Sequence, residues 1–221
     1  NNGFQFVNQI PAIYPVFEHD ENGNLVNDPK IPGGKSYDYG QTADGSRAYA
    51  GGINPAGAVR LDRDENLTNL TTGNLNLEYR FLKDFKLAVT YGFQSTASKK
   101  ETLANPYYGD AAKIGRISNL NENDFSWTLN EILSWGKTFG DHTVDAFIAH
   151  EATKNELDFH ESGKKKLILG NVTTLDDGLI RGDISGYRLT YAIESYFGQA
   201  RYDYKNKYYL STSVRRDGSS R

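Results

Sequence analysis

The chain has 221 residues, of which 38% are hydrophobic, and it carries a formal net charge of -3 with a pI of about 5.8. This charge gives no basic footprint for nucleic acid, and no apolar run is long enough for a transmembrane helix. The apolar content is low for a soluble core, yet Tyr (15), Phe (11) and Gly (22) are frequent. A disordered chain would lack the aromatics. An outer-membrane barrel, in which every second strand residue faces a polar lumen, has both properties.

Residues 1–70 are predicted to form an extracellular loop region with the start of the first strand, because prolines and Gly-Gly pairs interrupt any periodicity. Within it, Asp20–Asn24 predicts a turn with Gly23 at positive φ. The same run is similar to the start of a calcium loop, but Ile31 stands where the closing Glu is required. We therefore predict a turn and no metal site there.

Three hairpins are predicted within residues 71–221, because apolar and polar side chains alternate with a period of two. Two long connections, 97–124 and 152–186, are predicted to be loops between them. Short turns on one side and long loops on the other are typical of outer-membrane barrels. The predicted arms are 71–81 and 85–96 around Leu82–Asp84, about 125–151 around Lys137–Asp141, and about 196–215 around Lys205–Lys207.

Aromatic residues gather beside each of the three short turns, which indicates a girdle of rings at a membrane interface. The alternative is ordinary packing in a soluble β-sheet, since amphipathic strands also suit a sandwich. The rings are Tyr79, Phe81, Phe85, Trp135, Phe139, Tyr202, Tyr204 and Tyr208.

Several motifs together resemble the SusC/RagA-like family of TonB-dependent receptors, because their order and spacing match over residues 53–221. The loop Pro11–Gly23 is similar to the variable outer loop of that family, although less sharply. The motifs are Ile53-Asn54-Pro55, Tyr79–Leu82, Lys137–His142, the run Ser195–Tyr208 and the tail Arg215–Ser220.

The resemblance implies a 22-stranded barrel in the outer membrane of a Gram-negative bacterium of the Bacteroidetes, with an N-terminal plug. It also implies TonB-driven import of an oligosaccharide or peptide together with a SusD-like surface lipoprotein. The chain supplies about six antiparallel strands of that wall, in contact with outer-membrane lipid. The plug domain, through which TonB would act, and the rest of the barrel are expected outside these 221 residues.

No catalytic constellation is visible in the sequence. The four His residues are scattered, Cys is absent, and neither a nucleophile elbow nor a phosphate-binding Gly loop occurs. We therefore predict no enzyme activity, no cofactor and no metal. Polar residues on the predicted lumen face either line a pathway, bind a plug or form ion pairs that stabilise the wall: Glu78, Arg80, Lys86 and Gln94.

Five loop tyrosines stand among Gly, Asp and Asn, where flat rings beside hydrogen-bonding groups suit contacts with a sugar or a peptide. Packing of the loops on themselves, or contact with the lipoprotein lid, explains the same residues equally well. They are Tyr37, Tyr39, Tyr49, Tyr107 and Tyr108. Two further classes stay open: a soluble or surface β-sandwich that binds glycans in adhesion, and a passive porin.

Overall fold

The computed structural model describes residues 14–31, 34–42, 45–46, 52, 54–168, 170 and 174–220. None of the helices among these residues has the length and apolarity needed to cross a membrane. The elements are β1 (Gln41–Thr42), β2 (Gly45–Ser46), α2 (Pro55–Leu61), β3 (Arg63–Phe81), β4 (Phe85–Ala104), η1 (Gly109–Ala111), β5 (Arg116–Phe139), β6 (His142–Leu167), η2 (Leu175–Asp177), β7 (Gly178–Tyr204) and β8 (Tyr208–Ser219).

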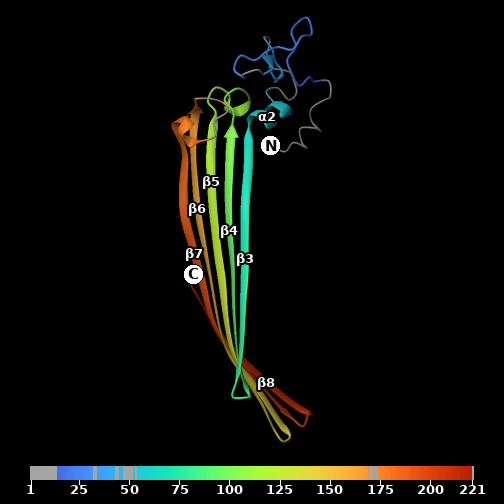
Figure 1. Cartoon of the computed structure of the whole chain (residues 1–221), viewed down its shortest axis with the longest axis vertical. Helices are drawn as coiled ribbons and strands as arrows, with labels where there is room; N and C mark the ends of the chain where they lie inside the picture. Colours follow the sequence, from blue (N-terminus) through green and yellow to red (C-terminus); the bar gives the residue numbers. More distant parts are fainter. Residues whose placement is uncertain are drawn as a thin grey trace. The chain divides into compact units, whose positions relative to one another are not determined.

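Strands β3 to β8 form one six-stranded antiparallel sheet in which every strand pairs with its neighbour in the chain (Figure 1). The β7–β8 pair runs in unbroken register from Tyr204 opposite Tyr208 to Ile193 opposite Ser219. This up-and-down order confirms the predicted series of hairpins. It needs no crossover, because each strand returns beside the one before it.

The chain divides into two compact units. The first, called the loop unit here, comprises 1–67, 99–120 and 161–185 and holds the long connections. The second, the hairpin unit, comprises 68–98, 121–160 and 186–221 and holds the three short turns. The predicted asymmetry between short turns and long loops is therefore present.

Two of the short turns place non-glycine residues at positive φ. Leu82 and Lys83 have φ of 47° and 60°, and Lys205 and Asn206 both have 55°. Paired positive φ values are those of type I′ turns, whose twist matches the twist of the flanking strands. A left-handed conformation costs an L-residue roughly 1–2 kcal/mol, so the ladders of hydrogen bonds on either side must offset this cost.

The strands extend well beyond the predicted arms. The first begins at Arg63, within the region 1–70 that was predicted to hold its start. The predicted loops 97–124 and 152–186 shrink to 105–115 and 168–177. The reason is that apolar and polar residues alternate only where one face of a strand meets apolar surroundings and the other meets water. Residues 94–102 are mostly polar on both faces, yet their backbone groups continue the ladder because pairing satisfies them.

In the hairpin unit the two faces of the sheet differ. The apolar face consists of odd-numbered residues of β3, β4 and β5 and even-numbered residues of β6, β7 and β8; the remaining strand residues form the polar face. Large side chains of the apolar face stay exposed, among them Leu77, Ile148, Leu210 and Val214. No second sheet within the described part of the chain covers them. A soluble sandwich would bury this face, whereas a barrel wall presents it to lipid.

Rings at the turn end of the apolar face form a chain of contacts. Tyr79 stacks on Phe81 with centroids 5.6 Å apart, Phe81 stacks on Phe85 at 5.5 Å, and Phe85 lies 6.5 Å from Trp135. His142 continues the series toward Tyr202 and Tyr204. The predicted clustering of aromatics beside the short turns is thus confirmed, with His142 as a member that the sequence did not single out.

The loop unit has a small core of its own, formed by Leu103, Ile117 and Leu167 with Leu175 packed against it. Short antiparallel bridges hold the segment from Phe17 to Tyr37. The Asp20 turn is confirmed: Gly23 has φ of 80°, and the Asp20 carboxylate accepts hydrogen bonds from the backbone amides of Asn22 and Asn24.

Candidate functional site

Helix α2 is held in the loop unit by the side chain of Asn54, which is buried. Its Oδ1 accepts a hydrogen bond from the amide of Gly57 at 3.0 Å and caps the helix. Its Nδ2 donates to the carbonyl oxygens of Val16 and Asp38 at 2.8 and 2.9 Å. One amide therefore joins three segments, and Pro55 follows it at the first helical position, where a proline needs no partner for its nitrogen.

Asn105 performs a similar role at the start of the connection between β4 and β5. Its side chain is only 2% exposed. Its Oδ1 accepts hydrogen bonds from the amides of Tyr107 and Tyr108 at 2.8 and 2.9 Å, and its Nδ2 donates to Asp62 Oδ1 at 2.5 Å. Pro106 follows and restricts Asn105 to an extended backbone. The amide thereby fixes the direction of the two tyrosines.

The structure brings four of the five predicted loop tyrosines together. The Tyr39 and Tyr108 rings stack with centroids 4.2 Å apart and planes inclined by 10°, and both Tyr37 and Tyr39 are buried. The Tyr107 hydroxyl accepts a hydrogen bond from the amide of Gly170 at 3.2 Å. These rings therefore pack against one another and against neighbouring loop segments. Tyr49 lies outside the described residues.

A cavity of about 460 Å³ opens beside these tyrosines. Two carboxylates that the sequence analysis did not single out line it: Glu18, which accepts a hydrogen bond from the Ser36 hydroxyl at 2.5 Å, and the buried Asp28, which accepts one from the Tyr108 hydroxyl. Lys30 also lines the cavity and is exposed. Aromatic rings, carboxylates and a lysine at one opening can hold a polar organic ligand through hydrogen bonds and ring contacts.

The electrostatic environment of the cavity is negative. Burial, followed by the hydrogen bond to Asp28, raises the pKa of Tyr108 to about 12. Burial and the nearby Asp62 also raise the pKa of Tyr39. Both phenols stay neutral at physiological pH, so they act there as hydrogen-bond donors and ring surfaces rather than as charges.

The raised phenol pKa predicts an alkaline weakening of the loop unit. Because the folded state holds the Tyr108 proton more tightly than the unfolded state does, its stabilisation is complete below about pH 10 and is lost as pH rises toward about 12. We expect Tyr108→Phe to remove the phenolate absorbance component with a midpoint near 12, measured at about 295 nm. The same component surviving in Tyr108→Phe but missing in Tyr14→Phe would contradict the assignment.

On the polar face of the hairpin unit, three of the four predicted lumen residues lie together. The Glu78 carboxylate lies 2.9 Å from Arg80 Nε and 3.8 Å from Lys86 Nζ. All three side chains are substantially exposed, so each pair contributes at most about 1 kcal/mol. Gln94 lies farther along β4 on the same face and is exposed, away from this group.

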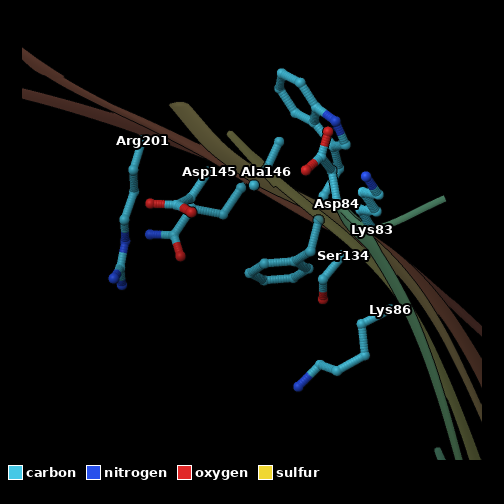
Figure 2. Close-up of a pocket in the computed structure, with 11 residues that line it drawn as sticks. Lys83, Asp84, Lys86, Ser134, Asp145, Ala146 and Arg201 are labelled. Atoms are coloured by element: carbon cyan, nitrogen blue, oxygen red, sulfur yellow. The ribbon is translucent and has the colours of Figure 1, made fainter. Parts of the chain in front are cut away.

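Lys86 also lines a polar cavity of about 400 Å³ on this face. In Figure 2, Lys86, Ser134 and Arg201 reach toward one side of the strands, with Asp145 between the two cations. Gly136 leaves room for the Asp145 carboxylate, because a Cβ there would lie 2.6 Å from its Oδ1. The cavity is a charged recess in the wall, and its residues belong to neighbouring hairpins.

A second polar network joins three strands and was not foreseen as a unit. Ser195 is fully buried and donates to Asp217 Oδ1 at 2.5 Å. The Arg215 guanidinium donates to Asp217, Ser195 and Glu151 at 2.8, 3.0 and 3.1 Å, and it lies over the Phe197 ring. The motif residues Ser195, Arg215 and Asp217 therefore tie β7 to β8, and Glu151 extends the tie to β6.

Chemistry of the catalytic or metal-binding kind finds no support in the described residues. No group of three or more His, Asp or Glu side chains among them is arranged to hold a metal ion. His150 lies between two carboxylates on the apolar face, and the acidic patch at Asp62–Glu65 is used in helix and strand contacts.

Comparison with known proteins gives a consistent result. No protein-family model matches the chain. It is 26% identical over 172 residues to the TonB-dependent receptor SusC of Bacteroides thetaiotaomicron and 24% identical over 170 residues to the TonB-dependent receptor P3 of Formosa agariphila. Each match covers 76% of this chain, which spans 17% of the length of either relative.

Among solved structures, the RagAB peptide transporter matches with a TM-score of 0.70 at 17% identity, covering 91% of this chain and 21% of that one. The RagAB peptide importer in its open-open state matches with a TM-score of 0.69 at 20% identity, covering 96% and 22%. These likenesses extend to strands and loops alike. The chain is thus SusC-like, with the fold of the β-barrel wall of TonB-dependent outer-membrane transporters.

Proposed function

We propose that this chain forms part of an importer that moves an oligosaccharide or a peptide across the outer membrane, driven through TonB and assisted by a SusD-like lipoprotein. The observation that carries the proposal is the sheet of the hairpin unit. It has an exposed apolar face and an opposite face of ion pairs and charged recesses. Such a sheet suits a wall between lipid and a wet lumen.

The choice of import as the proposed function rests on the SusC relative and on the RagAB neighbours, which are described as peptide transporters. Because the chain spans a small part of each, the roles of TonB and of the lipoprotein are inferences by analogy. The cavity between the loops adds a place where a ligand can be held. Its tyrosines, carboxylates and exposed Lys30 suit hydroxyl-rich and amide-rich ligands alike.

Uptake in whole cells tests the proposal. Cells producing the full-length protein are given an oligosaccharide mixture or a peptide mixture, and loss from the medium is followed by mass spectrometry. We expect depletion of one class, abolished when TonB is deleted. Depletion that survives the deletion would favour a passive porin, and recovery of the protein without detergent would favour a soluble glycan-binding sandwich.

The loop cavity has its own test. Lys30 lines the cavity through an exposed side chain, so Lys30→Glu alters the cavity without removing a packing residue. We expect the variant to lower the affinity for the imported ligand about tenfold, the effect of losing one charge-assisted hydrogen bond. His19→Ala, on an exposed side chain outside the cavity, is the matched control. Equal affinity of both variants and the parent would assign the tyrosines to loop packing alone.

A further inference from the structure

Charged residues gather on the apolar face around His150. His150 Nδ1 lies 2.9 Å from Glu131 Oε2, and its Nε2 lies 3.2 Å from Glu194 Oε1. Ionised carboxylates only accept hydrogen bonds, so with both glutamates ionised each ring nitrogen of His150 donates one. Glu194 also accepts a hydrogen bond from the Tyr196 hydroxyl at 2.7 Å. The two carboxylates are therefore engaged by neighbours within the sheet.

Arg216 lies beside this cluster and remains unpaired. It stands directly opposite Tyr196 in the β7–β8 register, on the apolar face. Unlike the Arg215 guanidinium, which lies on the polar face and has three partners, the Arg216 guanidinium forms no ion pair or hydrogen bond with any residue that the structure describes. A guanidinium on the lipid side of a barrel is destabilising unless an anion or water reaches it. Its planar fork is suited to a phosphate.

An apolar groove of about 600 Å³ adjoins Arg216. Its walls include Leu87, Leu133, Ile148 and Val214, and the Val214 residue is 74% exposed. His150 and Tyr196 stand with Arg216 at its polar margin. The groove therefore offers hydrocarbon surface on one side. At its edge stand the Glu131 carboxylate, which His150 engages, and the Arg216 guanidinium, which has no partner among the described residues and can meet the phosphate of an anionic lipid.

The height of the cluster in the membrane fits contact with a lipid headgroup. Glu131, His150, Tyr196 and Arg216 each lie eight residues from the end of their strand at the short turn. Eight residues span about 26 Å along a strand, and a tilt of about 45° reduces this to roughly 19 Å across the membrane. The apolar band of such barrels is about 25 Å tall. With the short turns on the periplasmic side, Arg216 stands in the outer part of the band, within reach of headgroups.

We propose that this groove binds one phosphorylated lipid of the outer leaflet, with an acyl chain against Leu133, Ile148 and Val214 and its phosphate on Arg216. The site is independent of import, since it lies on the face opposite the lumen. It would anchor the hairpins around β6, β7 and β8 at a fixed height in the membrane.

The test uses the full-length protein in detergent, with folding checked by heat-modifiable migration and lipid binding read by native mass spectrometry. The probes are phosphatidylglycerol, the diacylglycerol with the same chains, and inorganic phosphate. We expect phosphatidylglycerol to bind at least about tenfold more tightly than the diacylglycerol, and Arg216→Gln to remove that preference. Arg201→Gln, on an exposed arginine of the polar face, should keep it.

A second variant tests the groove itself. Val214→Trp fills it with an apolar side chain and should displace the lipid while leaving Arg216 in place. Equal binding of the two lipids, an Arg201→Gln effect as large as that of Arg216→Gln, or unchanged binding in Val214→Trp would each overturn the proposal. Competition by inorganic phosphate at concentrations comparable to those of the lipid would show recognition of a free anion and would also overturn it.

Discussion

Replacing Asn105 by alanine is expected to destabilise the loop unit by about 2–4 kcal/mol, the largest effect of any single loop substitution. The side chain accepts from two backbone amides and donates to Asp62 in a buried place, and each abandoned partner costs about 1–3 kcal/mol. Protease sensitivity of the connection 105–115, on intact cells producing the full-length protein, measures this change. Because Asn105 holds the backbone of Tyr108, the variant should also shift Tyr108 at the cavity and lower the affinity for the ligand.

Two further variants separate this effect from nonspecific damage. Asn105→Asp keeps the acceptor for both amides but sets a second carboxylate against Asp62, so an intermediate effect is expected. Asn22→Ala removes an exposed side chain, because only the backbone amide of Asn22 binds Asp20, and it should leave cleavage unchanged. Cleavage of Asn105→Ala at the rate of Asn22→Ala would contradict the role assigned to Asn105.

Replacing Arg215 by alanine is expected to destabilise the barrel wall and lower its urea midpoint. The guanidinium joins Glu151, Ser195 and Asp217 across three strands, but its side chain is 46% exposed, so solvent screens its ion pairs and the expected shift is modest. The urea midpoint of the folded full-length protein, read from heat-modifiable migration, reports the loss.

Arg215→Lys should recover only part of that loss, because one ammonium cannot meet three acceptors in the geometry of the guanidinium fork. Arg201→Ala serves as the matched control, because Arg201 is also exposed on the polar face, on the neighbouring strand β7. If Arg215→Ala and Arg201→Ala shifted the midpoint equally, the network would have no special part in holding β8 to β7 and β6.

The hairpins could be predicted from the sequence because one physical requirement recurs along them. Each side chain on the apolar face of β4, from Phe85 to Phe93, faces hydrocarbon, and each alternate one faces water, so the pattern has a period of two. The ends of the strands could not be predicted in this way. Between Phe93 and Leu103 the side chains of β4 are mostly polar on both faces, so no hydropathy pattern marks the strand that backbone pairing continues.

The loop cavity could be predicted only in part. Tyr107 and Tyr108 could be singled out as loop tyrosines, and the structure adds that the Asn105 side chain accepts hydrogen bonds from both of their amides. The stacking of Tyr39 on Tyr108 depends on how distant segments fold together, which no local pattern records. Asp28 resembled an ordinary turn residue, since its carboxylate does accept from the amide of Lys30, and its second role at the cavity depends on Tyr108.

The Arg215 network shows the same limit. The strings around Ser195 and Arg215 carried the family resemblance, but Glu151, which completes the network, lies 64 positions from Arg215 in the chain. A motif match can therefore mark residues that matter without showing their partners. The partners of a residue follow from the register between strands, which here sets Ser195 opposite Asp217.

The central claim is that the apolar face of the hairpin unit meets lipid while the polar face meets water. Because the chain contains no Cys, single cysteines at Lys86, Leu87, Val89 and Thr90 can carry spin labels in the full-length protein reconstituted in bilayers. We predict that labels at Leu87 and Val89 are relaxed by oxygen and those at Lys86 and Thr90 by a water-soluble nickel complex. Relaxation by the nickel complex at all four positions would place both faces of β4 in water and contradict the claim.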